Sequence, residues 1–306
     1  VDIDAEVIAK KVGTAYEMTV QLIELDEASK KALLDRSFRG KPYHEARGLD
    51  NTDNVYALIE NAGEVTSFSS TFTFYIQHAL GPENGQYAAL RENLLTPSAF
   101  EQKIGKNLYD VEALVWAELE HLGYAENYLL RDPLIVCYGK VYQPAYCELY
   151  YPRDYFGLPA WSERSAVYSE TVSALKERGV RILSGECICV RYMAEGITSI
   201  ECKLSTVLAK KEIPLLSFGE IMDAFEAQFY LDPPVGMKGE PMSIERIELC
   251  YTGEALADAD LDPNEPILKR KMRPTWVFTS TYAGDSNYRK HYFLDAETGE
   301  MIFTGG

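Results

Sequence analysis

The stretch Tyr292–Phe303, YFLDAETGEMIF, decides the fold predicted for the last third of the chain. Two apolar runs flank the polar centre DAETGE, a pattern typical of two strands joined by a tight turn. Asp295 can accept hydrogen bonds from backbone N–H groups of its own turn, and Gly299 can adopt the positive φ that a bulged loop needs. A calcium loop is excluded because the carboxylates are too few and wrongly spaced. The stretch therefore predicts a β-hairpin over 288–303.

The segments before this hairpin predict a sheet with a helix on one face. The run LSFGEIMDAFEAQFYL (216–231) predicts a helix that begins with Ser217 as its cap, and Glu220 three residues later completes a capping box. Strands are predicted on both sides of this helix, over 180–193, 196–214, 242–253 and 273–284. Strands, then a helix, then more strands favour an antiparallel sheet covered by that helix.

The first half of the chain mixes strand and helix patterns in the same way. Strands are predicted within 1–25, over 64–76 and twice within 129–151, and helices over 26–38, 96–105, 107–123 and 162–179. Loops or turns are predicted at 39–54 and 81–85. One face of the helix 107–123 is expected to be buried, through Val111, Leu114, Val115 and Leu119. The whole sequence thus predicts an α+β fold with antiparallel sheets, each packed against one or two helices.

The length of 306 residues indicates two domains. The segment PRDYFGLPAW (152–161) is rich in proline, glycine and aromatic residues. We therefore predict that it separates an N-terminal α+β domain, 1–160, from a C-terminal α+β domain, 161–306.

The charge argues against two classes of partner. With a formal net charge of -17, the chain lacks the basic surface that nucleic-acid binding or adhesion to an anionic membrane requires. No apolar run is long enough to span a membrane within residues 1–306.

Four motifs that mark common nucleotide-binding, zinc-protease or serine-hydrolase sites are missing from the sequence. It contains no GxGxxG, GxxxxGK[ST], HExxH or GxSxG motif. The run DADLDPNEP (258–266) carries acids at alternate positions, as a calcium loop does. However, Pro263 and Lys269 stand where such a loop needs glycine and glutamate, so an acidic turn is predicted. No cofactor or metal is expected.

The six cysteines offer three alternatives. Cys187 and Cys189 are two apart on a predicted strand, so they are expected to point to the same face. Cys202 on the next strand could form a disulfide with one of them if the register fits. Buried thiols are favoured over this disulfide, and a metal site comes third because no second ligand pair supports it.

His44 and Glu45 are the candidate functional residues outside the C-terminal region. They stand side by side in KPYHEARG, a predicted loop, and loops often carry functional residues. His78 and His121, which end a strand and a helix, are expected to be structural, and His291 lies in a strand among aromatic residues. Catalytic partners need only meet in space, so a hydrolase of cell-wall or peptide substrates stays open as an alternative.

Residues 195–306 resemble the C-terminal domain of the YycH/YycI-type extracytoplasmic regulators of Gram-positive bacteria, and the related PepSY modules. The resemblance rests on a helix, a strand, a PxW strand and a closing hairpin of the form D-A-x-T-G. The matching residues are Ile244, Ile247, Leu249, Tyr251, Pro274, Trp276, Asp295, Ala296, Thr298, Gly299 and Glu300. The family signature Pro274, Trp276, Asp295, Thr298 and Gly299 is expected to be structural.

The resemblance implies an exported protein of an uncharacterised lipoprotein family, held outside the membrane by a lipid anchor or a single helix upstream of Val1. Such domains act through protein contacts and carry no known catalytic constellation. The expected function is therefore a non-catalytic extracytoplasmic binding or regulatory protein, with another extracytoplasmic protein or peptide as partner. Two alternatives remain: a hydrolase with its site near His44 and Glu45, and a structural component of a surface assembly, built on the tyrosines of 146–159.

Overall fold

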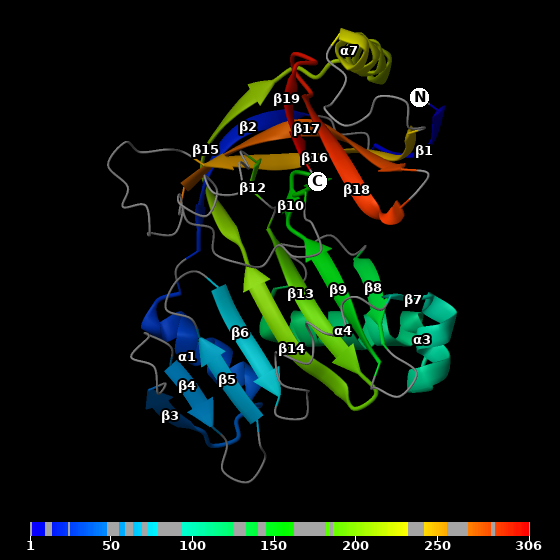
Figure 1. The fold of residues 1–306 in the computed structure, drawn as a ribbon. Helices are drawn as coiled ribbons and strands as arrows, with labels where there is room; N and C mark the ends of the chain where they lie inside the picture. Colours follow the sequence, from blue (N-terminus) through cyan, green and yellow to red (C-terminus); the bar gives the residue numbers. More distant parts are fainter. Residues whose placement is uncertain are drawn as a thin grey trace.

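Two large β-sheets and four helices make up the part of the chain that the computed structural model describes (Figure 1). The described residues are 2–9, 14–23, 25–47, 55–58, 64–68, 73–78, 94–124, 133–139, 145–161, 182–183, 186–231, 242–255, 269–282 and 285–305. Nearly all strand pairs are antiparallel, so the fold class is α+β, as predicted. None of the helices in these residues is long and apolar enough to cross a membrane.

The first sheet has nine strands, all paired in antiparallel fashion. In spatial order they are β3 (His44–Arg47), β4 (Val55–Leu58), β5 (Glu64–Phe68), β6 (Thr73–His78), β14 (Gly196–Lys203), β13 (Cys187–Met193), β9 (Tyr146–Pro152), β8 (Leu134–Tyr138) and β7 (Leu94–Leu95).

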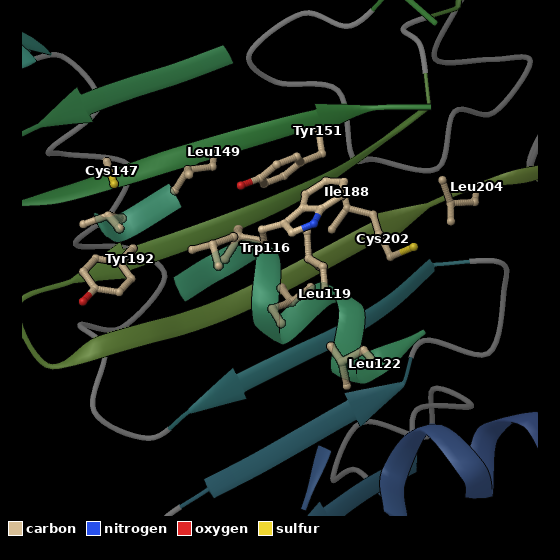
Figure 2. Packing of buried hydrophobic residues seen from close by; sticks show 14 of the residues in the cluster. Trp116, Leu119, Leu122, Cys147, Leu149, Tyr151, Ile188, Tyr192, Cys202 and Leu204 are labelled. Carbon is tan, nitrogen blue, oxygen red and sulfur yellow. The ribbon is translucent and has the colours of Figure 1, made fainter. Parts of the chain in front are cut away.

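Helices cover one face of this sheet (Figure 1): α1 (Glu27–Ser37), α3 (Pro97–Ile104) and α4 (Leu108–Leu122). Figure 2 shows Trp116, Leu119 and Leu122 of α4 in the core between helix and sheet. The α4 helix begins at its cap, Asn107, and ends at Gly123, which has a φ of 86°. Trp116 of α4 packs against Tyr151 of β9, with ring centroids 5.6 Å apart. Leu114 was predicted to be buried, but it is 51% exposed. The buried face of α4 includes Trp116 in its place, together with Val111, Val115, Leu119 and Leu122.

The second sheet has eight strands. Its main path is β1 (Asp2–Ile8), β16 (Met242–Ala255), β17 (Lys269–Tyr282), β18 (Asp285–Asp295) and β19 (Met301–Gly305). Off this path, β12 (Ile182–Leu183) pairs with β16, and β2 (Ala15–Leu22) pairs with both β17 and β15 (Ser205–Ile213). The α7 helix (Phe218–Leu231) packs on one face, where Phe225 stacks on Phe278 with centroids 4.2 Å apart.

Strands from both halves of the sequence meet in each sheet. The first sheet combines β3–β9 with β13 and β14, and the second combines β1 and β2 with β15–β19. The predicted separator 152–161 forms a small hairpin, β10 (Asp154–Tyr155) and β11 (Leu158–Pro159), packed against the second sheet. There, the N–H of Trp161 donates to the carbonyl of Tyr251 at 2.8 Å. Whether the chain divides into folding units at residue 160 stays a prediction.

Two predicted elements differ from the structure. The predicted loop 39–54 contains strand β3, because pairing with β4 supplies hydrogen-bond partners that local composition does not record. The predicted strand 64–76 is two strands, β5 and β6, whose register places Phe68 opposite Phe74. Alternation of apolar and polar residues continues through the turn region, so it does not show where the chain reverses. The predictions for 50–54, 81–85, 162–179 and 258–266 lie outside the described residues.

Candidate functional site

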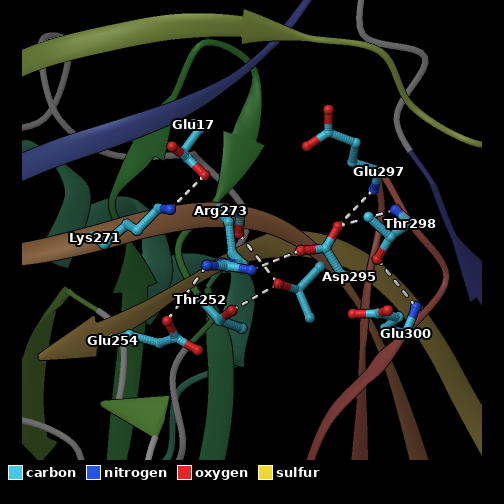
Figure 3. Close-up of polar contacts among 10 residues, drawn as sticks. Glu17, Thr252, Glu254, Lys271, Arg273, Asp295, Glu297, Thr298 and Glu300 are labelled. Carbon is cyan, nitrogen blue, oxygen red and sulfur yellow. Dashed lines mark hydrogen bonds and ion pairs between the residues drawn. The ribbon is translucent and has the colours of Figure 1, made fainter.

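The closing hairpin uses its polar residues to hold its own turn (Figure 3). The Asp295 carboxylate accepts hydrogen bonds from the backbone N–H groups of Glu297, at 2.8 Å, and Thr298, at 3.1 Å. Its second oxygen accepts from Arg273 Nη1 at 2.8 Å. Gly299 has a φ of 75°, and its N–H donates to the Asp295 carbonyl at 2.8 Å. The predicted hairpin is therefore present, with Gly299 at the position that needs a positive φ.

The hairpin also packs closely on helix α7. A Cβ added to Gly299 would lie 3.0 Å from the Cβ of Ala224 and 3.3 Å from Cδ1 of Leu216. Gln228 of α7 donates to the Gly299 carbonyl and accepts from the Met301 N–H, both at 2.7 Å. These contacts leave no room for a side chain at Gly299, so this turn is shaped by packing.

The two remaining signature residues lie on β17, next to this hairpin. The Pro274 carbonyl accepts a hydrogen bond from the Ala296 N–H at 3.1 Å. The Trp276 side chain is 4% exposed, and its ring lies 5.2 Å from that of Phe218 on α7. The structure thus brings all five signature residues to one end of the second sheet.

His44 and Glu45 lie far from that group in the fold. Both belong to β3, the outermost strand of the nine-stranded sheet, where they pair in register with Leu58 and Ala57 of β4. The structure thus places them on a strand and not in a loop. The hydrolase hypothesis built on them stays a prediction.

The other predicted histidines have different surroundings. His121 lies in the last turn of α4, with Nε2 2.9 Å from the Arg36 carbonyl oxygen. On β18, Nδ1 of His291 lies 3.1 Å from Oγ1 of Thr279. His78 ends strand β6, as predicted.

The cysteines are buried free thiols, as predicted. Cys187 and Cys189 pack in the same cluster, but Cys202 lies opposite Ile188 and packs on the other face of the sheet. The register therefore does not suit a disulfide from Cys202 to either of them. Burial raises the pKa of Cys187 to about 12 and that of Cys189 well above its ordinary value, so neither thiol is a ready nucleophile.

A buried ion network lies on the second face of the nine-stranded sheet. Arg191 pairs with Glu148 at 2.7 Å and with Glu201 at 2.9 Å, and the Tyr150 hydroxyl donates to Glu148. Burial lowers the pKa of Arg191, but Glu201 and Glu148 outweigh it, so the pKa is raised. Because Glu148 is fully buried, we interpret this network as structural. Sequence reasoning missed it because acidic residues are spread over the whole chain.

The turn between β10 and β11 places an aromatic residue where the backbone disfavours one. Tyr155 pairs with Leu158, and the two residues between them, Phe156 and Gly157, have φ values of 57° and 93°. Positive φ at both central positions is the pattern of a type I′ turn, which prefers Asn-Gly. A left-handed conformation costs a residue with a Cβ about 1–2 kcal/mol. The Phe156 side chain is nonetheless 44% exposed.

Phe156 is part of a cluster that we call the aromatic–lysine patch: Tyr16 of β2, Phe156 of the β10–β11 turn and Lys210 of β15. The ring centroids of Tyr16 and Phe156 are 4.8 Å apart. The Lys210 ammonium lies 4.2 Å from the Phe156 centroid and 4.4 Å from that of Tyr16. Such cation–π contacts contribute about 0.5–1 kcal/mol each at exposed sites. The patch thus holds a positive charge over two half-exposed rings.

The patch lies beside an exposed strand. Along β15, residues 208–212 are exposed, and the register shifts by one residue between Val207 and Ala209. Leu208 is 52% exposed, and Lys211 stands next to Lys210, with Glu212 following. Sequence reasoning treated 152–161 as a boundary and the tyrosines of 146–159 as a possible interface, but it did not single out Phe156. The available signal was the dipeptide Phe-Gly at 156–157. In a two-residue turn between strands, the residue before glycine is usually Asn and not Phe.

The described residues show no metal site: no group of three or more His, Cys, Asp or Glu side chains there could hold a metal ion.

A similar fold occurs in a solved structure. An uncharacterized protein from Eubacterium rectale ATCC 33656 superposes with a TM-score of 0.57 over 98% of this chain and 90% of that chain, at 12% sequence identity. This likeness shows the fold alone. The alignment with the Bacillus megaterium YpeB C-terminal domain covers 92% of this chain and 97% of that chain, at 11% sequence identity. Its TM-score of 0.34 does not show a common fold. No protein-family model and no curated protein sequence matches the chain.

Proposed function

We propose that this chain is a non-catalytic binding or regulatory protein that contacts another protein through the aromatic–lysine patch. The observation that supports this most is Phe156, a large apolar side chain that is 44% exposed on a backbone with a φ of 57°. Left-handed non-glycine residues tend to occur at functional sites, where the strain serves a purpose. Aromatic residues also contribute most of the binding energy in many protein interfaces.

The partner segment is proposed to be acidic. The chain carries a net charge of -17, yet Lys210 places a cation over the rings of Tyr16 and Phe156 on an exposed part of β15, with Glu212 two residues further on. Lys211 points to the other face of β15, where it lies opposite Glu17 of β2. Glu17 pairs with Lys271 at 2.7 Å. A carboxylate of the partner segment therefore fits Lys210, and apolar groups of the segment fit the exposed Phe156 ring. Nucleic acid fits poorly, because the rest of this acidic chain would repel it.

The location is proposed from the resemblance of residues 195–306 to extracytoplasmic regulators. On this proposal the partner is another extracytoplasmic protein or peptide, and the chain is held at the membrane by a segment upstream of Val1.

The experiment measures binding of two short fluorescent peptides to the full chain by fluorescence anisotropy. One peptide alternates glutamate and valine, and the other alternates lysine and valine. The proposal expects the acidic peptide to bind and the basic one not to bind. Substitution Phe156→Ser should weaken binding of the acidic peptide about tenfold, a loss of roughly 1.4 kcal/mol.

The matched control is Tyr109→Ser. Tyr109 is an aromatic residue on α4 with 78% exposure, and it lies outside the patch. This variant should bind the acidic peptide as the wild type does. The proposal is wrong if the acidic peptide does not bind, or if both variants bind it with the same affinity.

A further inference from the structure

Two cysteines face each other across neighbouring strands of the first sheet. In the register of β8 and β9, Cys137 lies directly opposite Cys147. Both thiols are free, and both side chains pack in the core beneath the helices, so they point to the same face (Figure 2 shows Cys147).

Their backbone spacing suits a disulfide. Residues directly opposite in an antiparallel pair have Cα atoms about 4.5 or 5.5 Å apart, depending on the hydrogen-bonding position. Disulfides join Cα atoms about 4.4–6.8 Å apart, so either position is within range. The Cβ atoms of such pairs lie about 4.5–5.5 Å apart, against the 3.5–4.5 Å of a disulfide, and a small approach of the two strands closes that gap.

The other four cysteines lack this arrangement. Cys187 and Cys189 stand on one strand, opposite Lys203 and Glu201. Cys202 lies opposite Ile188, and Cys250 lies on the second sheet opposite Thr275. The chain thus contains a single directly opposed cysteine pair, since all six cysteines are among the described residues.

We propose that Cys137 and Cys147 form a cross-strand disulfide when the chain folds in an oxidising compartment. The oxidant is a disulfide, either a small molecule such as oxidised glutathione or a protein disulfide. One cysteine thiolate attacks it, forming a mixed disulfide and releasing one oxidant thiolate. The second cysteine thiolate then displaces the other half. The two cysteines lose two protons and two electrons in total, and the oxidant is reduced to two thiols.

Burial determines when this exchange can happen. Burial, with a smaller effect of Glu101, raises the pKa of Cys137 to about 11, and burial raises the pKa of Cys147 well above its ordinary value. The attacking species is the thiolate, so exchange in the folded core is slow. The bond therefore forms before the helices close over β8 and β9, and afterwards it resists reduction. It is a structural link and not a fast switch.

The test refolds the full chain from denaturant, once in a mixture of oxidised and reduced glutathione and once in excess reductant. Thiols are then alkylated under denaturing conditions and counted by intact mass. The proposal expects six alkylated thiols after reducing refolding and four after oxidising refolding, which is six minus the bonded pair.

Trypsin without reductant locates the bond. Lys140 separates the peptide 132–140, with Cys137, from the peptide 141–153, with Cys147. The proposal expects these two peptides to be recovered joined. It is overturned if the oxidised sample keeps six thiols, or if the peptides are recovered apart or joined mainly to those of the other cysteines.

Two variants check the assignment. In Cys137→Ala, the oxidised chain should keep all five of its remaining thiols, whereas Cys250→Ala should still lose two. If Cys137→Ala does not fold, the mapping of the wild type decides alone. The acidic-peptide assay tests the aromatic–lysine patch on the second sheet, whereas the proposed disulfide lies in the core of the first sheet. The failure of either proposal therefore leaves the other standing.

Discussion

Two tight turns in this protein use positive φ in opposite ways. In the closing hairpin, glycine occupies the left-handed position, and Asp295 accepts hydrogen bonds from the turn's own N–H groups. In the β10–β11 turn, Phe156 occupies such a position and exposes 44% of its side chain. The first turn is explained completely by its local chemistry and its packing. The second turn contains Phe156, which a type I′ turn does not favour. The presence of Phe156 is therefore explained by contacts outside the turn.

The largest effect is expected from Gly299→Ala. The new Cβ would be strained at a φ of 75° and would lie 3.0 Å from the Ala224 Cβ, so the free energy of unfolding should fall by about 3 kcal/mol. The control Gly40→Ala has a φ of 73° but nothing within 4 Å, and it should cost about 1 kcal/mol. Urea unfolding measures both. Equal losses would show that helix α7 does not restrict the closing hairpin.

A smaller effect is expected from the aspartates whose side chains accept hydrogen bonds from backbone N–H groups of the two turns. Asp295→Ala removes the acceptor of two backbone N–H groups and of Arg273, so it should cost about 2 kcal/mol. Asp154 Oδ1 accepts from the Gly157 N–H at 2.8 Å, so Asp154→Ala should cost about 1 kcal/mol or less. Thermal unfolding of both variants tests this order. If Asp154→Ala costs more, the β10–β11 turn is the more tightly held of the two.

Phe156→Asn should change stability very little. Asparagine suits the type I′ turn, and this gain offsets the lost contacts with Tyr16 and Lys210, so the unfolding free energy should stay within about 1 kcal/mol of the wild type. Urea unfolding decides the point. A loss above about 2 kcal/mol would show that Phe156 is there for stability, and the contrast between the two turns would disappear.

The smallest effect concerns the start of α7, on which the closing hairpin rests. The Ser217 hydroxyl and N–H both donate to Glu220 at 2.7 Å, and they lower the pKa of that carboxyl from its ordinary 4.5. A carboxylate whose folded pKa is lowered stabilises the protein above its unfolded pKa and loses this effect as the pH falls through the folded value.

Wild type should therefore be slightly more stable than Glu220→Gln above pH 4.5, with the difference fading at lower pH. Unfolding curves over a pH series measure it. A difference that grows on acidification would contradict this capping role.

Sequence reasoning predicted the features that depend on neighbouring residues. The capping box of Ser217 and Glu220, the ends of helix α4 and the closing hairpin all follow from residues within a few positions of one another. It was wrong, or left alternatives open, where distant segments decide. The strand β3 exists through its pairing with β4, and the orientation of Cys202 depends on the register of β14 with β13.

The candidate site depends on still longer-range contacts. Tyr16, Phe156 and Lys210 come together only because β2 pairs with β15 and because the β10–β11 hairpin packs against the same sheet. No pattern within the sequence joins these three residues. The local signal, Phe before Gly in a short turn, shows only that the position is unusual.

The most direct test of the patch is to measure stability and acidic-peptide affinity on the same preparations of wild type, Phe156→Asn and Tyr109→Asn. If Phe156 serves binding, Phe156→Asn should bind the acidic peptide about tenfold more weakly while its unfolding free energy stays within about 1 kcal/mol of the wild type. Tyr109→Asn should change neither quantity. Unchanged affinity in Phe156→Asn, or a loss of affinity that accompanies loss of the folded state, would contradict a binding role for the patch.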